Sequence, residues 1–314
     1  MPAVGGFVFD SSGAPADREV RLYRRDTGDL LDKTRSSGGV TGDPHFDEVT
    51  LLLHMDGADG STTFADSSIA PKTVTSHGGA KISTTQSKFG AASAYFDGVN
   101  GYLETPYTND AFRWWDSPFT LEVFVFPVAL STFSFVDVTN VVSKLISNSS
   151  LENSTNYWCF GPISDGRVLL RYWSGATNAV YSAATIPENQ WSHIALVVKD
   201  GKITIYVNGV GSTPVAIAGT PQDTQTLPLL VGATNSRYVN GYIDELRITK
   251  GVARYTADFT PPAARFPDIQ GLETTLALGE YYFATNYTGE VQVVCLDDDS
   301  APLENDLILR TFPV

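Results

Sequence analysis

The stretch QWSHIALVVKDGKITIYVNG, residues 190–209, decides the fold of this chain. Two runs of alternating side chains flank Asp200 and Gly201, and such alternation is typical of β-strands with a buried face. An Asp-Gly pair between two such runs is a strong short-range signal for a hairpin closed by a type I′ turn. We therefore predict two antiparallel strands joined at residues 200 and 201.

The same signals recur on the N-terminal side of this hairpin. GPISDGRVLLRYW, residues 161–173, places Asp165 and Gly166 before another alternating run. FTLEVFVFP, residues 119–127, is apolar on both faces, which predicts a strand that is covered on both sides. Strands at a spacing of roughly 8 to 12 residues indicate a sandwich or jelly roll. Because no helical stripe exceeds about two turns, the sequence predicts an all-β chain.

Composition and charge exclude several classes of protein. Of 314 residues, 18% are charged and 11% aromatic, with 27 Gly and 17 Pro, a balance that favours strands joined by tight turns. The net charge of −14 repels phosphate backbones, so we expect no nucleic-acid partner. MPAVGG at the start resembles no export signal, and no apolar run reaches the roughly 20 residues of a membrane span. We expect a soluble protein without membrane insertion, made in a reducing cytosol.

Four segments resemble the laminin-G-like, concanavalin-A-like lectin domains that are common in bacteriophage virion proteins. They are KFGAASAYFDGVNGYLETP (88–106), FTLEVFVFP (119–127), QWSHIALVVKDGKITIYVNG (190–209) and GYIDELRITKGVARYTADFTPP (241–262). This resemblance implies a two-sheet jelly roll over residues 47–267. It also implies a domain that binds sugars and, in some members, a calcium ion.

The two ends of the chain each contain three short strand-like runs that cannot close a core alone. Joined, residues 1–40 and 270–314 supply about six strands, enough for a small sandwich. VRLYRRDTGDLL (20–31) followed by GEVQVVCLDDD (289–299) resembles a carboxypeptidase-regulatory or immunoglobulin-like domain of phage tail proteins. We therefore predict one discontinuous immunoglobulin-like β-sandwich with the jelly roll inserted in a loop. Two independent half-domains are the alternative.

Catalytic signals are weak in this sequence. Glycoside hydrolysis needs two carboxylates across the scissile bond, and some enzymes of the concanavalin-like superfamily place them on a single strand. The strand 119–127 offers only Glu122. The four histidines show no metal-ligand spacing, and His193 reads as structural. We expect a protein that is not an enzyme, although a carboxylate pair from distant loops stays open.

Two aspartates are candidates for a metal site. In GYIDELRI, simple alternation places Asp244 on one face with Tyr242, Leu246 and Ile248, and a carboxylate among apolar neighbours must be paired, hydrogen-bonded or bound to a cation. Asp56 is its expected partner, because the first and last strands of this fold class lie side by side. Six to eight oxygens would suit Ca²⁺. Acceptance of backbone N–H groups without a metal is the alternative.

Aromatic side chains on predicted loops are candidates for carbohydrate binding, because sugars stack on such rings while polar neighbours bind the hydroxyl groups. Trp191 is expected in the core, and some of the other rings are expected there too. The candidates are Trp114, Trp115, Tyr157, Trp158, Arg171, Trp173 and Tyr238.

These observations together predict a tail-type virion protein on the exterior of a phage particle. The expected partners are a host-surface glycan and other virion proteins, with several copies of the chain on each particle. The alternative is a purely architectural protein of the tail or the capsid exterior, a decoration protein whose aromatic loops contact neighbouring copies.

Overall fold

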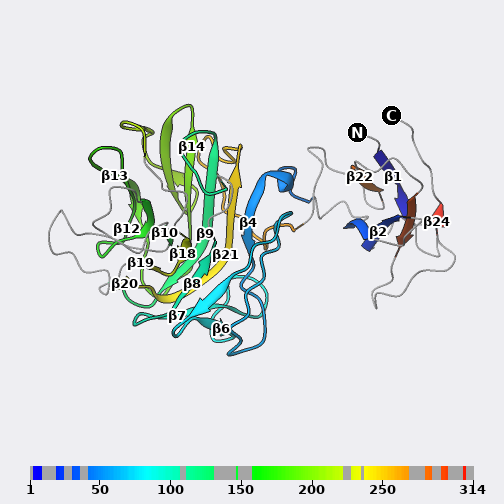
Figure 1. Ribbon diagram of the computed structural model, residues 1–314, viewed down its shortest axis with the longest axis horizontal. Coiled ribbons are helices and arrows are strands. Elements are labelled where there is room, and N and C mark those ends of the chain that lie inside the picture. Colours follow the sequence, from blue (N-terminus) through cyan, green and yellow to red (C-terminus); the bar gives the residue numbers. More distant parts are fainter. Residues whose placement is uncertain are drawn as a thin grey trace. The chain divides into compact units, whose positions relative to one another are not determined.

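The computed structural model of the chain is all-β apart from one short 3-10 turn, η1 (Phe46–Glu48), within its described residues (Figure 1). It describes residues 3–8, 19–24, 30–35, 42–106, 111–130, 146–147, 158–221, 228–234, 237–268, 280–284, 291–295 and 307–308. No helix in these segments is long and apolar enough to cross a membrane. The chain divides into two compact units, one of residues 1–47 with 267–314 and one of residues 48–266.

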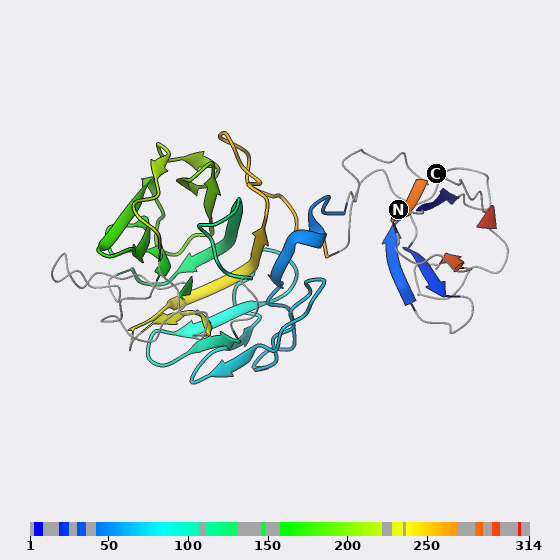
Figure 2. The same ribbon diagram turned by 45° about the horizontal axis from the view of Figure 1, so that its top comes forward.

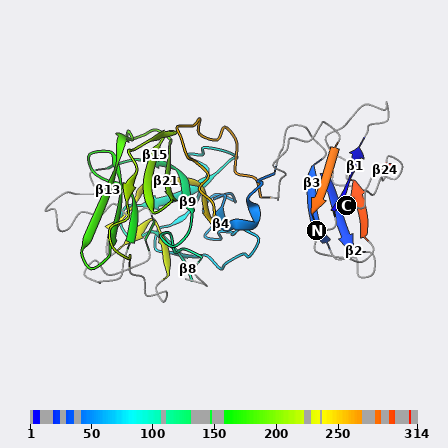
Figure 3. The same cartoon turned by 90° about the horizontal axis from the view of Figure 1, so that it is seen from above.

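The first unit consists of strands from both ends of the chain. β1 (Ala3–Val8) pairs antiparallel with β22 (Glu280–Ala284) on one side and β24 (Leu307–Ile308) on the other. β2 (Glu19–Arg24) lies between β3 (Leu30–Arg35) and β23 (Val291–Cys295), again antiparallel. In Figure 3 the blue strands of the N-terminus lie beside the orange and red strands of the C-terminus. Both sheets of this unit therefore combine strands from the two ends of the chain.

The second unit is a sandwich of two large antiparallel sheets. The seven-stranded sheet runs in the order β13 (Thr177–Thr185), β12 (Arg167–Trp173), β11 (Trp158–Pro162), β10 (Ile146–Ser147), β18 (Leu229–Val231), β8 (Tyr102–Thr105) and β5 (Thr75–His77). The nine-stranded sheet runs in the order β16 (Val210–Gly211), β15 (Lys202–Val207), β14 (Ser192–Lys199), β9 (Phe119–Pro127), β21 (Asn240–Lys250), β7 (Ser93–Asp97) and β6 (Lys81–Ser83), with β17 (Val215–Ala216) beside β15 and β4 (Val49–Leu53) beside β21. A short ribbon of β19 (Ala233–Thr234) and β20 (Arg237–Tyr238) completes the unit.

The hydrophobic core lies between these two sheets because every second side chain of each strand points inward. Leu121 of β9 and Leu196 of β14 are fully buried there, in one cluster with Phe160 and Leu170 of the other sheet. The predicted hairpin forms between β14 and β15, and Asp200 and Gly201 both have positive φ, 51° and 67°, as a type I′ turn requires. The other side chains of the nine-stranded sheet, those between the inward-pointing ones, lie on its outer face.

Strand β21 changes its neighbour along its length, and a β-bulge marks the change. Residues 240–243 pair with β7 and residues 246–249 pair with β4, while β9 follows the other side of the strand (Figure 2). The register shifts between Asp244 and Arg247, and Glu245 between them has a φ of 49°. A bulge inserts one extra residue and bends the strand locally, so the side chains after it exchange faces.

This bulge corrects the predicted faces of β21. Simple alternation places Asp244 together with Leu246 and Ile248, but those two residues lie in the core. Asp244 pairs with Phe124 in the register of β9 and stays on the outer face, as does Tyr242. A one-residue insertion in a strand has no periodicity of its own, so alternation could not reveal it.

The segment after β21 covers part of this outer face, and we call residues 251–266 the strap. Tyr255 and Phe259 of the strap pack against Tyr206, and their own rings stack with centroids 3.6 Å apart. Phe266 at its end lies over the Arg247 guanidinium at 4.0 Å. The strap therefore covers the outer face around Tyr206 and Arg247.

Candidate functional site

Two of the predicted binding rings lie in the core. Trp114 and Trp158 are 0% and 1% exposed. Trp114 packs edge to face on Tyr172, with ring centroids 5.0 Å apart. A ring enclosed on both faces has no surface for a sugar, so the prediction for these two residues is corrected. Burial of an indole removes a large apolar area from water, which favours a buried position over the exposed position that the sequence predicts.

The remaining predicted residues have mixed positions. Trp115 is half-buried and packs against Trp114 at 5.6 Å. Arg171 is buried on β12, in register with Cys159, whereas Trp173 at the end of the same strand is half-buried. Tyr157 lies outside the described residues. The structure therefore does not bring this predicted set together as one surface.

Tyr238 lies in a small cluster at the edge of the seven-stranded sheet. Its ring is 6.4 Å from that of Tyr102, which stacks on His77 at 4.5 Å. The Nε2 atom of His77 lies 3.5 Å from a carboxylate oxygen of Glu104, and both side chains are about one-third exposed. Sequence reasoning missed His77 and Tyr102, because β5 and β8 are too short to show which side chains pair across them.

A row of aromatic side chains crosses the outer face of the nine-stranded sheet. Tyr95 of β7, Tyr242 of β21, Phe126 of β9 and Trp191 before β14 follow one another with ring centroids 5.2, 5.8 and 5.6 Å apart. All four residues are half-buried. The ammonium of Lys81 lies 5.9 Å from the Tyr95 ring at one end. We call these four rings the aromatic row.

The position of Trp191 differs from the core position that the sequence predicts. Ile194 points into the core and His193 points to the outer face, so alternation carries Trp191 outward as well. The alternation of side chains in the sequence therefore already indicated that Trp191 points outward. It was missed because a tryptophan beside a buried strand is most often interpreted as part of the core.

The second candidate site is the acidic bulge, which we define as Asp244 with its neighbours Glu245 and Asp56. One oxygen of Asp244, Oδ2, accepts the backbone N–H groups of Lys88 and Phe89 at 2.7 and 3.0 Å. The other, Oδ1, is buried and has no hydrogen-bond partner among the described residues. The fold thus brings Asp56 and Asp244 into the same region, and one carboxylate oxygen keeps its full acceptor capacity.

Burial raises the pKa of Asp244 to about 7, and the nearby charges of Glu245 and Asp56 add to this shift against the two backbone hydrogen bonds. Asp56 is itself exposed, with a 3.8 Å contact to Arg265 of the strap. Within the described segments no group of three or more ligating side chains could hold a metal ion. A calcium ion between Asp56 and Asp244 would need backbone oxygens or water as further ligands, so the site stays a prediction.

A third group of polar side chains lies buried under the strap around Glu122. The Oε1 atom of Glu122 accepts hydrogen bonds from Nε and Nη2 of Arg247 at 2.9 and 2.7 Å. Its Oε2 atom accepts the Tyr255 hydroxyl at 2.6 Å and lies 3.2 Å from Nε2 of His193. Although burial alone would raise the pKa of Glu122, Arg247, His193 and Arg254 hold it well below its usual range.

Comparisons with known proteins agree with this architecture. A family model described as the concanavalin A-like lectin/glucanases superfamily, of the laminin-G type, matches residues 96–254, just over half of the chain. Comparison with curated protein sequences gives no match. The all-β fold and the two-sheet jelly roll are therefore confirmed.

Solved structures with the same fold include binding domains of larger proteins. Domain 4 of AbnA, an extracellular GH43 arabinanase from Geobacillus stearothermophilus determined with arabinotriose, has 20% identity and a TM-score of 0.49 over 66% of this chain and 94% of that domain. The binding domain of Paraclostridial Mosquitocidal Protein 1 has 18% identity and a TM-score of 0.50 over 65% of this chain. The binding domain of botulinum neurotoxin serotype D has 12% identity and a TM-score of 0.47 over 68%. The matched region spans about half of each toxin domain, 49% in both cases.

Proposed function

Because the chain belongs to the laminin-G-like family of the concanavalin A-like lectin/glucanase superfamily, we propose that its jelly roll binds carbohydrate without cleaving it. The aromatic row is the observation that carries this proposal. Side chains on the solvent face of a sheet are normally polar, yet three strands and the residue before a fourth contribute four adjacent, partly exposed rings here.

The chemistry of the row suits a sugar. Aromatic faces offer apolar area for the C–H faces of a sugar ring, while hydroxyl groups and an ammonium can bond its hydroxyls. Tyr95 and Tyr242 bring hydroxyl groups into the row, and Lys81 stands at its end. The Tyr242 hydroxyl is protonated at neutral pH, and burial, followed by the influence of Tyr95, raises its pKa further.

The environment of Glu122 supports binding over hydrolysis. A general acid in glycoside hydrolysis needs a raised pKa and access to the glycosidic oxygen. Glu122 is 0% exposed, and both of its oxygens are occupied by side chains under the strap. Its lowered pKa keeps it ionised, so the one carboxylate of β9 serves the structure.

We further propose that the protein is a virion component whose jelly roll contacts a host-surface glycan. The resemblance of the chain ends to phage tail domains supports this assignment, as does the pairing of both ends in one unit, which could dock to the particle. The alternative architectural role is favoured by Val210 and Val215. These side chains, 50% and 43% exposed, lie on short strands at the sheet edge and suit contact with another subunit.

The test measures binding of the full chain to a glycan array and to purified bacterial envelope polysaccharide. Phe126→Ala and Trp191→Ala should each weaken binding by about 2 kcal/mol or more, roughly thirtyfold, with melting temperatures that still show a folded jelly roll. Tyr181→Ala is the matched control, because Tyr181 is a 38% exposed ring on the other sheet. Unchanged glycan binding in both row variants would reject the row as the site. Intact binding with failed particle assembly would favour the architectural role.

A further inference from the structure

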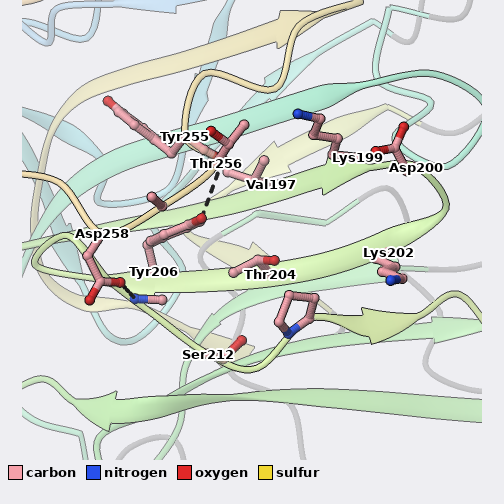
Figure 4. Close-up of a pocket in the computed structure, with 13 residues that line it drawn as sticks. Val197, Lys199, Asp200, Lys202, Thr204, Tyr206, Ser212, Tyr255, Thr256 and Asp258 are labelled. Carbon is pink, nitrogen blue, oxygen red and sulfur yellow. Dashed lines mark hydrogen bonds between the residues drawn. The ribbon is translucent and has the colours of Figure 1, made fainter.

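A cleft of about 360 Å³ lies on the outer face of β14 and β15, at the opposite end of β14 from the aromatic row (Figure 4). Outward side chains of these two strands, among them Thr204 and Tyr206, form its floor. The strap supplies one wall with Asp258, and residues 211–214 supply the other with Ser212. Its volume falls near the lower end of the roughly 300–1,000 Å³ of small-molecule sites. It suits one sugar unit, and its end at Lys199 lies roughly 25 Å along β14 from Trp191 of the row.

The walls of this cleft are connected before any ligand arrives. Asp258 Oδ1 accepts the backbone N–H of Gly211 at 2.9 Å, which joins the strap to the opposite wall. The Tyr206 hydroxyl donates to the carbonyl oxygen of Tyr255 at 3.4 Å, and the N–H of Phe259 donates to Gly209 at 3.0 Å. A preformed cleft loses little conformational entropy on binding.

The end of the cleft at the β14–β15 hairpin is positively charged, and this charge does not stabilise the sheet. Lys199 and Lys202 lie directly opposite each other in the register of β14 and β15, and like charges in that position are destabilising. Both are exposed, and neither makes an ion pair with any described residue. Asp200 in the turn lines the same end and offsets one of the two charges. A net cationic end on a chain with a net charge of −14 indicates a place for an anionic group.

The opposite end of the cleft offers acceptors and hydroxyl groups. Figure 4 shows Asp258 beside Tyr206 at this end, with Lys199 and Lys202 at the other and Ser212 and Thr204 between. One oxygen of Asp258 holds the wall, which leaves the second to accept from ligand hydroxyls. The two ends therefore differ in charge along the length of one small ligand.

From this arrangement we infer that the cleft binds a sugar acid, with the carboxylate of a uronic acid or related unit at Lys199 and Lys202 and its hydroxyl groups toward Asp258, Ser212 and Thr204. The inference rests on the proposed function and specifies a second subsite for it. Two ammonium groups on one carboxylate form charge-assisted contacts that a neutral sugar lacks. A glycan with acidic units could then reach both the cleft and the aromatic row.

The experiment compares acidic sugars with their neutral methyl esters. Glucuronate, galacturonate and N-acetylneuraminate oligosaccharides, each with its ester, are titrated into the full chain by calorimetry at low and high salt. We expect the acids to bind at least tenfold more tightly than the esters, with the preference falling as salt rises. Lys199→Met and Lys202→Met should each lower acid binding at least tenfold. Arg167→Met, which removes a partly exposed guanidinium on the other sheet, should keep the acid preference.

The outcomes separate this inference from the proposed function. Equal binding of acids and esters, or no effect of Lys199→Met and Lys202→Met, overturns the sugar-acid subsite. If neutral glycans still bind and Phe126→Ala still weakens them, carbohydrate binding at the row stands alone. If no glycan of either kind binds, both proposals fail.

Discussion

Glu122 and Asp244 are two buried carboxylates on adjacent strands of one sheet face, and their surroundings differ completely. Glu122 has Arg247, Tyr255 and His193 on its oxygens. Asp244 has two backbone N–H groups on one oxygen, and its charged neighbours are Glu245 and Asp56. The pKa of the first therefore falls, whereas that of the second rises to about 7.

The difference shows what a buried carboxylate does once its partners are known. Full compensation by cations and hydroxyl groups makes Glu122 an anchor that holds the strap over the sheet. Partial compensation leaves Asp244 with an unused oxygen next to a second carboxylate, an arrangement that favours a bound cation. The bulge at Glu245 separates the two cases, because the extra residue places Arg247 opposite Glu122 and away from Asp244.

The largest expected effect comes from breaking the compensated pair. Glu122→Gln removes the carboxylate charge that the buried Arg247 guanidinium contacts at 2.7 Å, and we expect a loss of about 3–5 kcal/mol in the free energy of unfolding. Urea denaturation at pH 7 measures it. The double variant Glu122→Leu with Arg247→Met should cost less than the single change, because the carboxylate and the guanidinium that contacts it are removed together. A loss below about 1 kcal/mol in the single variant would show that the pair is not an anchor.

A bound cation should compensate the negative charge of the buried Asp244 carboxylate. If Asp56 and Asp244 hold Ca²⁺, saturating calcium at about 100 times its dissociation constant should stabilise the jelly roll by about 2.7 kcal/mol, and chelator should reverse this. Thermal melts at pH 8 with calcium or chelator provide the measurement. Asp244→Asn should abolish the calcium effect. A melt that chelator does not change, together with an unaltered melt of Asp244→Asn, would reject the ion.

The smallest effect is the pH dependence of Asp244 in chelator. Its folded pKa of about 7 lies above the ordinary value of 3.8 for an aspartate, so its protonated form stabilises the fold at low pH. This stability is lost as the pH rises through 7. Between pH 5 and pH 8 the wild type should therefore lose about 2.5 kcal/mol relative to Asp244→Asn. Denaturant melts of both proteins at the two pH values test it, and parallel curves would contradict the raised pKa.

Much of the fold could be predicted because it depends on local signals. The turn at Asp200 and Gly201 forms as its dipeptide predicts, and both residues have positive φ. The expectation that the first and last strands of the jelly roll lie side by side holds for β4 and β21. That adjacency brings Asp56 near Asp244, the pair that the sequence predicts as a metal site.

The sequence predicts the candidate binding surface less well than it predicts the fold. Trp114 and Trp115 are neighbours in a loop, yet one ring is fully buried and the other is half-buried. The four rings of the aromatic row come from segments that lie far apart along the chain. Only the order of the strands in the sheet shows that these rings are neighbours. The cleft likewise requires the strap to return over β15.

By itself, the sequence determined the all-β class and the central hairpin, because alternation and turn chemistry act over a few neighbouring residues. Only the tertiary structure decided the face of Asp244, the burial of Trp114 and the enclosure of Glu122. Each of these depends on a bulge, on the packing of the core between the two sheets or on a strap packed against distant strands. Such contacts join residues that are remote in the chain, and their energies appear only when the sheets are assembled.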